Sequence, residues 1–130
     1  MTNKTEISFE SPGILSMLSD LGDEDLDALA FGVIAFDSDC IIRRYNAPES
    51  RFTGLSVDRV VGRDLFTEVA QCMNNYLVAQ RFKDALEKQT TLDVTIDFVL
   101  TWRMRPTPVQ LRLLAAHDTN LRFLLLTRLA

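Results

Sequence analysis

The sequence FGVIAFDSDCIIRRY, residues 31–45, carries the clearest structural signal in this chain. It begins with a short apolar run, continues with the turn-forming residues Asp37, Ser38 and Asp39, and ends in a β-rich run from Cys40 to Tyr45. Aspartate and serine favour turns because their side chains bond the nearby backbone. Short β-rich runs on either side of a turn are typical of paired strands. The stretch therefore predicts a β-hairpin.

Directly after the hairpin the sequence predicts short helices. Asn46 is a good helix N-cap, Pro48 is tolerated in a first turn, and Glu49 stands three residues after the cap. Residues 56–61 and 64–69 indicate two further short helices, because glycines interrupt the pattern around them. We expect this part of the chain to be compact but irregular.

Further along, the hydrophobic period changes from helical to strand-like. Residues 76–88 mostly follow the 3.6-residue period and predict the one longer helix. Residues 91–102 are rich in β-branched and aromatic side chains, 109–115 alternate between apolar and polar, and 121–129 form an apolar run. The order of elements predicts an α+β domain, in which helices cover a five-stranded antiparallel sheet.

Upstream of the hairpin the sequence predicts a peripheral helical segment. The apolar residues from Ile14 to Leu21 recur at helical spacing, and the acidic residues 23–27 suit the start of a second short helix. A length of 130 residues is enough for one domain and too short for two. We expect residues 1–28 to form an N-terminal cap on a core of residues 29–130.

Composition argues against several classes of function. The net charge is -4 and no basic run occurs, which speaks against binding to nucleic acid or to anionic lipid. No run approaches the ~20 apolar residues that span a bilayer, and residues 1–10 lack the order of a signal peptide, so we expect a cytoplasmic protein. One histidine, with two cysteines that are not spaced as CxxC, suggests neither a metal centre nor a disulfide framework.

Several segments, taken in order and at their spacings, resemble the photoactive yellow proteins, which have the PAS fold. The resemblance covers nearly the whole chain from about Asp25 onward. Gly54 to Gly62 is common to PAS domains in general, whereas Tyr, Glu, Thr and Cys in this combination are specific to the family. The segments that carry it are LAFGVI (29–34), YNAPE (45–49), TG (53–54), VVGR (60–63), Phe66, VAQC (69–72) and MRPT (104–107).

The resemblance implies a blue-light photoreceptor that holds 4-hydroxycinnamic (p-coumaric) acid as a thioester on Cys72. Tyr45 and Glu49 match the pair that hydrogen-bonds the phenolate oxygen of that chromophore, and Thr53 matches the residue that supports the tyrosine. Met104 matches a methionine linked to thermal recovery of the dark state. The remaining chromophore-binding residues that the resemblance implies are Phe66, Val69, Ala70 and Trp102.

The resemblance also implies a mechanism without enzymatic turnover. Light isomerises the chromophore, Glu49 passes its proton to the phenolate, and a newly ionised carboxylate is left in the core. An unpaired buried charge is costly, so local unfolding of the helix at Ile14 to Leu21 is expected to give the signal. We expect a downstream signalling protein as partner, and a monomer or weak dimer.

Three positions depart from the family pattern. Leu55 stands where many members have an arginine that covers the chromophore, so this guanidinium is absent unless Arg51 or another basic residue reaches in. Gln71 replaces a proline that usually precedes the attachment cysteine, and Trp102 replaces a tyrosine. Neither of the last two changes removes a group on which attachment depends.

Without the resemblance, the same residues have simpler interpretations. Glu49 would complete a capping box with Asn46, Cys72 would be a small core hydrophobe, and Tyr45 an ordinary strand residue. The main alternative function is a chromophore-free PAS module that binds another protein. It would have no need for the Tyr, Glu, Thr and Cys combination. A cysteine hydrolase would need a nearby base, and His117 lies far along the chain.

Overall fold

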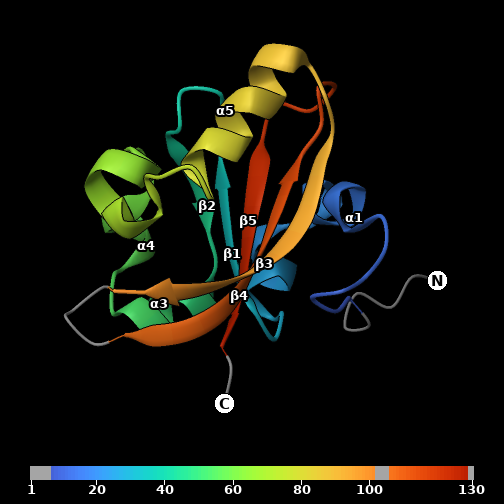
Figure 1. Cartoon of the computed structure of the whole chain (residues 1–130). Coiled ribbons are helices and arrows are strands. Elements are labelled where there is room, and N and C mark those ends of the chain that lie inside the picture. The colour runs from blue at the N-terminus through green and yellow to red at the C-terminus, as the bar shows by residue number, and fades with distance from the viewer. Residues whose placement is uncertain (1–6, 102–105, 129–130) are drawn as a thin grey trace.

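The computed structural model describes residues 7–101 and 106–128, and its centre is one five-stranded sheet (Figure 1). The strands lie in the order β2-β1-β5-β4-β3, and each neighbouring pair is antiparallel. The predicted α+β class and five-stranded antiparallel sheet are confirmed. The strands are β1 (Gly32–Phe36), β2 (Ile42–Tyr45), β3 (Leu92–Leu100), β4 (Thr107–Ala115) and β5 (Arg122–Arg128).

The predicted hairpin is formed by β1 and β2. Ile34 pairs with Tyr45, which fixes the register of the hairpin at its open end. In the turn, Oδ1 of Asp37 accepts hydrogen bonds from the backbone N–H groups of Asp39 and Ile41, at 2.9 and 3.0 Å. The aspartate thus satisfies two backbone donors that the tight turn would otherwise leave without partners, as is usual for this residue type.

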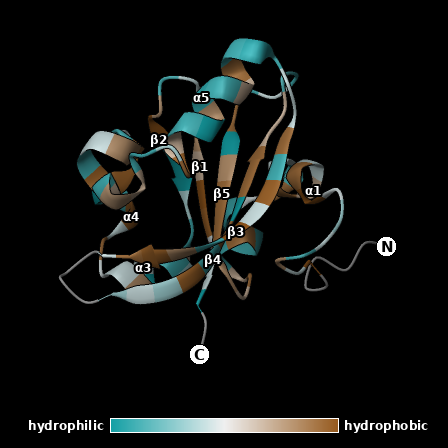
Figure 2. Ribbon diagram, viewed as in Figure 1, coloured by the Kyte–Doolittle hydropathy of each residue, from teal (hydrophilic) through white to brown (hydrophobic). Residues whose placement is uncertain are grey.

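Between the hairpin and β3 lie the helical elements that cover one face of the sheet. They are α3 (Ala47–Thr53), α4 (Val57–Val60), the π-helical turn η2 (Leu65–Val69), the 3₁₀ turn η3 (Gln71–Met73) and α5 (Ala79–Lys88). In Figure 2 the exposed side of α5 is hydrophilic, whereas the strands beneath it are mostly hydrophobic. Such an arrangement is typical of an amphipathic helix packed on a sheet.

Helix α5 begins three residues later than its periodicity predicts. Tyr76 was counted among the apolar positions of the helix, but it lies before α5 and 78% of its surface is exposed. Oδ1 of Asn75 accepts hydrogen bonds from the N–H groups of Leu77 and Val78, at 3.0 and 3.2 Å. These bonds hold residues 75–78 in a turn that precedes the helix, and the regular helix begins at Ala79.

The opposite face of the sheet is covered by the N-terminal segment, in which α1 (Ile14–Asp20) and α2 (Asp23–Asp27) form as predicted. Ile14 and Leu18 of α1 are buried in a cluster that includes Val33 and Phe123 of the sheet. Because helices cover both faces, β1 is buried along its whole length instead of alternating. Figure 1 shows α1 and α5 on opposite sides of the strands.

Two arginines of the sheet bind backbone carbonyl groups of the N-terminal segment. Nη1 of Arg112, on β4, donates hydrogen bonds to the carbonyl oxygens of Phe9 and Ser11, both at 2.9 Å. Nη2 of Arg44, on β2, donates to the carbonyl oxygen of Leu21 at 2.8 Å. Since bonds from charged donors are stronger than neutral ones, these contacts attach the segment to the sheet in addition to its apolar packing.

Candidate functional site

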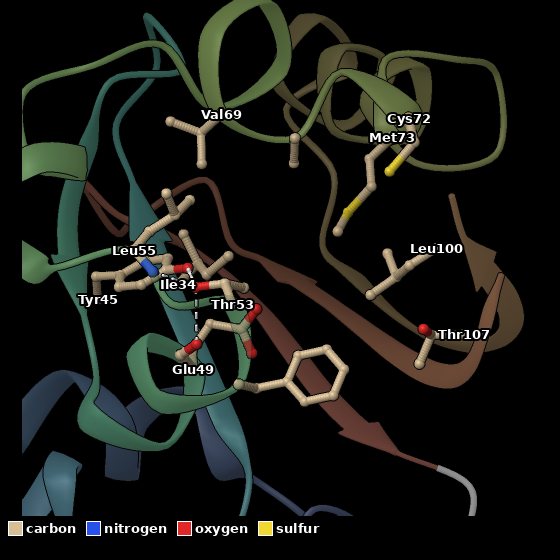
Figure 3. Close-up of a pocket in the computed structure, with 12 residues that line it drawn as sticks. Ile34, Tyr45, Glu49, Thr53, Leu55, Val69, Cys72, Met73, Leu100 and Thr107 are labelled. Carbon is tan, nitrogen blue, oxygen red and sulfur yellow. Dashed lines mark hydrogen bonds between the residues drawn. The ribbon is translucent and has the colours of Figure 1, made fainter. Parts of the chain in front are cut away.

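A pocket opens between the hairpin, α3 and the segment that contains η2 and η3 (Figure 3). It contains about 500 Å³ of space between atoms, part of which is open to solvent. A largely apolar lining with a few polar groups is typical of sites for small organic ligands. The lining residues are Ile34, Tyr45, Glu49, Phe52, Thr53, Leu55, Val69, Ala70, Cys72, Met73, Leu100 and Thr107.

Three of the lining residues, Tyr45, Glu49 and Thr53, form a polar corner at one end of the pocket. The Tyr45 hydroxyl lies 2.8 Å from Oγ1 of Thr53, which donates to the backbone carbonyl of Glu49 at 3.0 Å and accepts from the N–H of Leu55. A threonine hydroxyl has a single proton. Because that proton goes to the carbonyl of Glu49, the hydroxyl of Tyr45 must be the donor toward Thr53.

Glu49 is almost completely buried, and the cap of α3 uses only its backbone. Oδ1 of Asn46 accepts from the N–H of Glu49 at 3.3 Å, as in a capping box. The N–H of Asn46, however, donates to the carbonyl oxygen of Val33 at 3.1 Å. The side chain of Glu49 instead accepts a hydrogen bond from Nη1 of Arg128 at 3.0 Å, through Oε1. The capping role therefore leaves the carboxyl group available to the pocket.

The buried position of Glu49 depends on a glycine in the neighbouring strand. Gly32, the first residue of β1, lies so close that a Cβ atom added there would overlap Oε1 of Glu49. Glycine is the residue type that permits such an approach between a backbone and a side chain. Gly32 thus creates the space that the carboxyl group occupies.

Burial dominates the electrostatics of the polar corner. It raises the pKa of Glu49, because the ionised form loses its hydration, and the nearby guanidinium of Arg128 opposes that rise. Burial also raises the pKa of Tyr45 to about 12; the charge of Glu49 adds to the effect, while Thr53 and Arg128 oppose it. Tyr45 is therefore a neutral hydrogen-bond donor at physiological pH.

Cys72 lies across the pocket from the polar corner, next to Met73 (Figure 3). Its thiol is free and half-buried. The only other cysteine in the chain, Cys40, is also a free thiol, but it lies at the hairpin turn and does not line this pocket. The pocket thus brings together one thiol, a set of apolar walls and a group of hydrogen-bonding side chains.

The structure brings six of the nine predicted site residues to this pocket. They are Tyr45, Glu49, Thr53, Val69, Ala70 and Cys72. Phe66 does not line it; it is buried in the core, where its ring centroid lies 5.6 Å from that of Phe36 in an edge-to-face contact. Trp102 and Met104 lie outside the residues that the structure describes.

Arg128 was not among the residues predicted to form the site. Its guanidinium lies over the ring of Phe52, 3.2 Å from the centroid, while Nη1 binds Glu49. The alternation of side chains along β5 was the signal that could have predicted its position. Leu124 and Leu126 belong to the core cluster on the pocket side of the sheet, and Arg128, two residues further on, lies on the same face. Leu55 gives the pocket an apolar side chain, and Arg128 brings a positive charge to the polar corner from β5.

Two classes of site find no support in the part of the chain that the structure describes. Residues 7–101 and 106–128 contain no group of three or more histidine, cysteine or acidic side chains placed to bind a metal ion. Within the same ranges, every helix is too short or too polar to cross a lipid bilayer.

Comparisons with known proteins agree with this geometry. Residues 22–126 match the family model of the PAS fold. The chain is 32% identical to the photoactive yellow protein of Rhodothalassium salexigens over 107 residues, which is 82% of this chain and 85% of the relative. The photoactive yellow protein of Halochromatium salexigens is also 32% identical over 107 residues, with the same coverage.

A solved structure shows the same relationship in three dimensions. The photoactive yellow protein domain of the sensor histidine kinase Ppr from Rhodospirillum centenum superposes with a TM-score of 0.80 at 36% sequence identity. The match covers 87% of this chain and 98% of that domain. The predicted relationship is confirmed: this chain belongs to the photoactive yellow protein family of PAS domains.

Proposed function

We propose that this chain is a blue-light photoreceptor that carries 4-hydroxycinnamic acid as a thioester on Cys72. The main support is that the thiol of Cys72 and the polar corner of Tyr45, Glu49 and Thr53 face each other across one pocket. An elongated acid can then be held by its carbonyl carbon at one end and by its phenolic oxygen at the other. The relatives that match this chain are photoactive yellow proteins.

At the attachment end, Cys72 supplies the nucleophile. Its sulfur forms a bond to the carbonyl carbon of an activated acid, the bond from that carbon to the leaving group breaks, and the thiol proton goes to solvent or to the leaving group. Because the side chain is half-buried and not enclosed, the thiol is accessible to an incoming acid. The bound pigment supplies absorption of blue light and isomerisation about its double bond.

At the phenolic end, the residues of the polar corner stabilise negative charge. A buried anion without donors is costly, because it loses its hydration. The hydroxyl of Tyr45 donates to Thr53 in the structure, so it has to turn toward a phenolate in order to donate to it. Thr53 can follow by moving its own proton from the carbonyl of Glu49 to the oxygen of Tyr45. Two hydroxyl rotations therefore prepare the site.

Glu49 is proposed as the proton donor after light absorption. Burial raises its pKa, which favours the neutral form relative to an exposed glutamate. Loss of the proton leaves a carboxylate in the core, and the desolvation of a buried ion costs several kcal/mol, which is comparable with the stability of a whole domain. We propose that residues 1–28, the N-terminal cap, detach from the core 29–130 and give the signal.

The proposed signal requires a receiver and no catalysis by the domain itself. One of the solved relatives is a domain of a sensor histidine kinase. We therefore propose that this chain acts as a sensor, not as an enzyme, and that its partner is a downstream signalling protein. The chain's charge of -4 favours a protein surface over nucleic acid as that partner.

The test is to incubate the purified protein with an activated derivative of 4-hydroxycinnamic acid and to record visible absorption and intact mass. Wild type and Cys40→Ser are expected to gain the mass of one acyl group and to turn yellow, whereas Cys72→Ser gains neither. Cys40→Ser is the matched control because it removes the other free thiol. A pigment that attaches at Cys40, or none at all, would reject the photoreceptor function in favour of a chromophore-free PAS module.

A further inference from the structure

Arg128 is a partly buried cation that uses only part of its hydrogen-bonding capacity. Nη1 binds Oε1 of Glu49 at 3.0 Å, while Nε and Nη2 are both buried and find no hydrogen-bond partner among the described residues. The side chain as a whole is 22% exposed, and its planar group lies on the ring of Phe52. Buried donors without partners are rare in folded proteins, which makes these two nitrogens a candidate binding site.

A second arginine, Arg112, has hydrogen-bond partners for all of its side-chain nitrogens and serves as a comparison. Arg112 is bound to both oxygens of Asp93 through Nε and Nη2, at 2.9 Å each, and its Nη1 donates to two carbonyl groups. All three of its nitrogens have partners. Arg128, in contrast, has one hydrogen-bond partner, and its Nε and Nη2 have none among the described residues. The group lies beside Glu49 and Phe52, and both of these residues line the pocket.

We propose that Arg128 is a further functional residue of the pocket, which holds Glu49 as a carboxylate in the empty protein and releases it to take up a proton when a ligand anion enters. The inference rests on the proposed function, because it assumes an anionic oxygen beside Tyr45. Arg128 acts through Glu49 and is in this sense a positioning residue. It brings its charge to the polar corner from β5, whereas Leu55, in the loop after α3, has none.

The charges in the polar corner support this role. Among the residues that the structure describes, the titratable groups that line or adjoin the pocket with Glu49 are Tyr45 on β2, Arg128 on β5 and the thiol of Cys72 on η3. In the empty pocket an ionised Glu49 and Arg128 sum to zero. When a phenolate is present, its negative charge balances the positive charge of Arg128, provided that Glu49 is neutral. An ionised Glu49 would leave a net charge of one negative unit in the polar corner. Like charges a few ångströms apart disfavour ionisation, so Glu49 is the group that protonates.

Through Nε and Nη2 of Arg128, a ligand can cause the protonation of Glu49. An anionic oxygen that approaches Nε or Nη2 competes with Glu49 for the same guanidinium. The ion pair weakens, and burial then favours the neutral carboxylic acid. A proton from solvent enters the site at Oε1 or Oε2 of Glu49. The same group becomes the proton donor on which the proposed light response depends.

Infrared spectroscopy tests this directly, since a protonated buried carboxyl has a C=O stretching band that a carboxylate lacks. The band of Glu49 is identified by its loss in Glu49→Gln. We expect empty wild type at neutral pH to lack the band and pigment-loaded wild type to show it. Empty Arg128→Gln is expected to show it already, because burial is then unopposed, and empty Arg128→Lys to lack it, because the charge is kept.

Arg122→Gln is the matched control. It removes the same charge from the same strand and face, six residues away, where the arginine contacts Asn120 and not Glu49. This variant should behave like wild type. A nearby positive charge lowers the pKa of an acidic group by about 1–3 units. In pigment-loaded Arg128→Gln the pKa of the pigment's phenol should therefore be higher, and the midpoint of acid bleaching should rise by about one pH unit or more.

Two outcomes overturn the inference: a Glu49 band already present in empty wild type, or no difference between empty wild type and empty Arg128→Gln. The comparison of empty with loaded wild type requires no substitution, so it remains decisive if a variant does not fold. Failure of the proposed function is a separate result. It appears as the absence of any adduct on Cys72, which leaves the experiments on the empty protein unaffected.

Discussion

Replacement of Arg112 by glutamine tests how the N-terminal cap is attached to the sheet. Arg112 lies on β4 and is only 7% exposed. Its Nη1 donates to the carbonyl oxygens of Phe9 and Ser11, and its other nitrogens bind Asp93. Glutamine is too short to preserve this geometry and has no charge. The change therefore removes both the contacts to the cap and the ion pair on the sheet.

The expected loss follows from these contacts. A hydrogen bond to a charged group contributes about 1.5–3 kcal/mol, so the two bonds to the cap dominate. The pair with Asp93 adds about 1 kcal/mol or less, because the carboxylate is 47% exposed and screened by water. Water replaces part of what is lost, and the cap should be destabilised by roughly 2–4 kcal/mol. Since 1.4 kcal/mol is a factor of ten, cap opening should increase roughly 30- to 700-fold.

Hydrogen exchange followed by mass spectrometry measures this opening segment by segment. Peptides from residues 9–21 should exchange faster in Arg112→Gln, whereas peptides from β1 and β5 should keep most of their protection. Arg43→Gln is the control, because it breaks an ion pair with Asp37 in which the arginine is 53% exposed, and it should change stability by less than about 1 kcal/mol. Unchanged exchange of the cap, or equal loss of protection in cap and core, would refute the reasoning.

Three further predictions concern the polar corner. Gly32→Ala places a methyl group against Oε1 of Glu49. The carboxyl group should then lose its bond to Arg128, which infrared spectroscopy detects, or the fold should lose about 1–3 kcal/mol of stability, which urea denaturation measures. An unperturbed carboxyl with wild-type stability would contradict this. Tyr45→Phe removes one donor from Thr53 and should cost about 0.5–1.5 kcal/mol, and a loss above about 3 kcal/mol would show that the corner is coupled more widely. Glu49→Gln should change the pH dependence of stability. Because the folded pKa of Glu49 is raised, its contribution is complete below the unfolded value of about 4.3 and is lost as pH rises through the folded pKa. The variant should therefore gain unfolding free energy relative to wild type across that window, and a constant difference would reject the raised pKa.

Local signals were enough to predict most of the fold. The turn residues after Phe36 and the change from helical to strand-like period predicted the hairpin, the helices and the last three strands. Boundaries were less accurate where a side-chain turn precedes a helix, as at Asn75 before α5. Strand β4 also begins at Thr107, two residues before the alternating run 109–115 that predicted it. Pro108 is tolerated there because β5 pairs with β4 only from Val109 onward.

The candidate site was only partly predictable, because its electrostatics come from residues far apart in the sequence. Tyr45, Glu49 and Thr53 belong to one local segment, and the resemblance to the family implied that they act together. Arg128 reaches Glu49 across 79 residues of sequence, through the placement of β5 beside β1 in the middle of the sheet. No local pattern contains that information, although the alternation along β5 gives the face on which Arg128 lies.

One of the links between the pocket and the cap is a buried amide. Asn46 is fully buried, and its Oδ1 accepts from the N–H groups of Val33 and Glu49. Its Nδ2 donates to the carbonyl oxygens of Leu26 and Phe31, both at 3.0 Å. The first turn of α3, the start of β1 and the end of α2 thus share one side chain. Any movement of that turn that follows ionisation of Glu49 must stretch the bond to Leu26, at the boundary between the proposed cap and the core. An amide with all its hydrogen bonds made cannot accommodate such a movement without losing one of them. The bond to Leu26 is expected to break first, because Leu26 belongs to the peripheral segment.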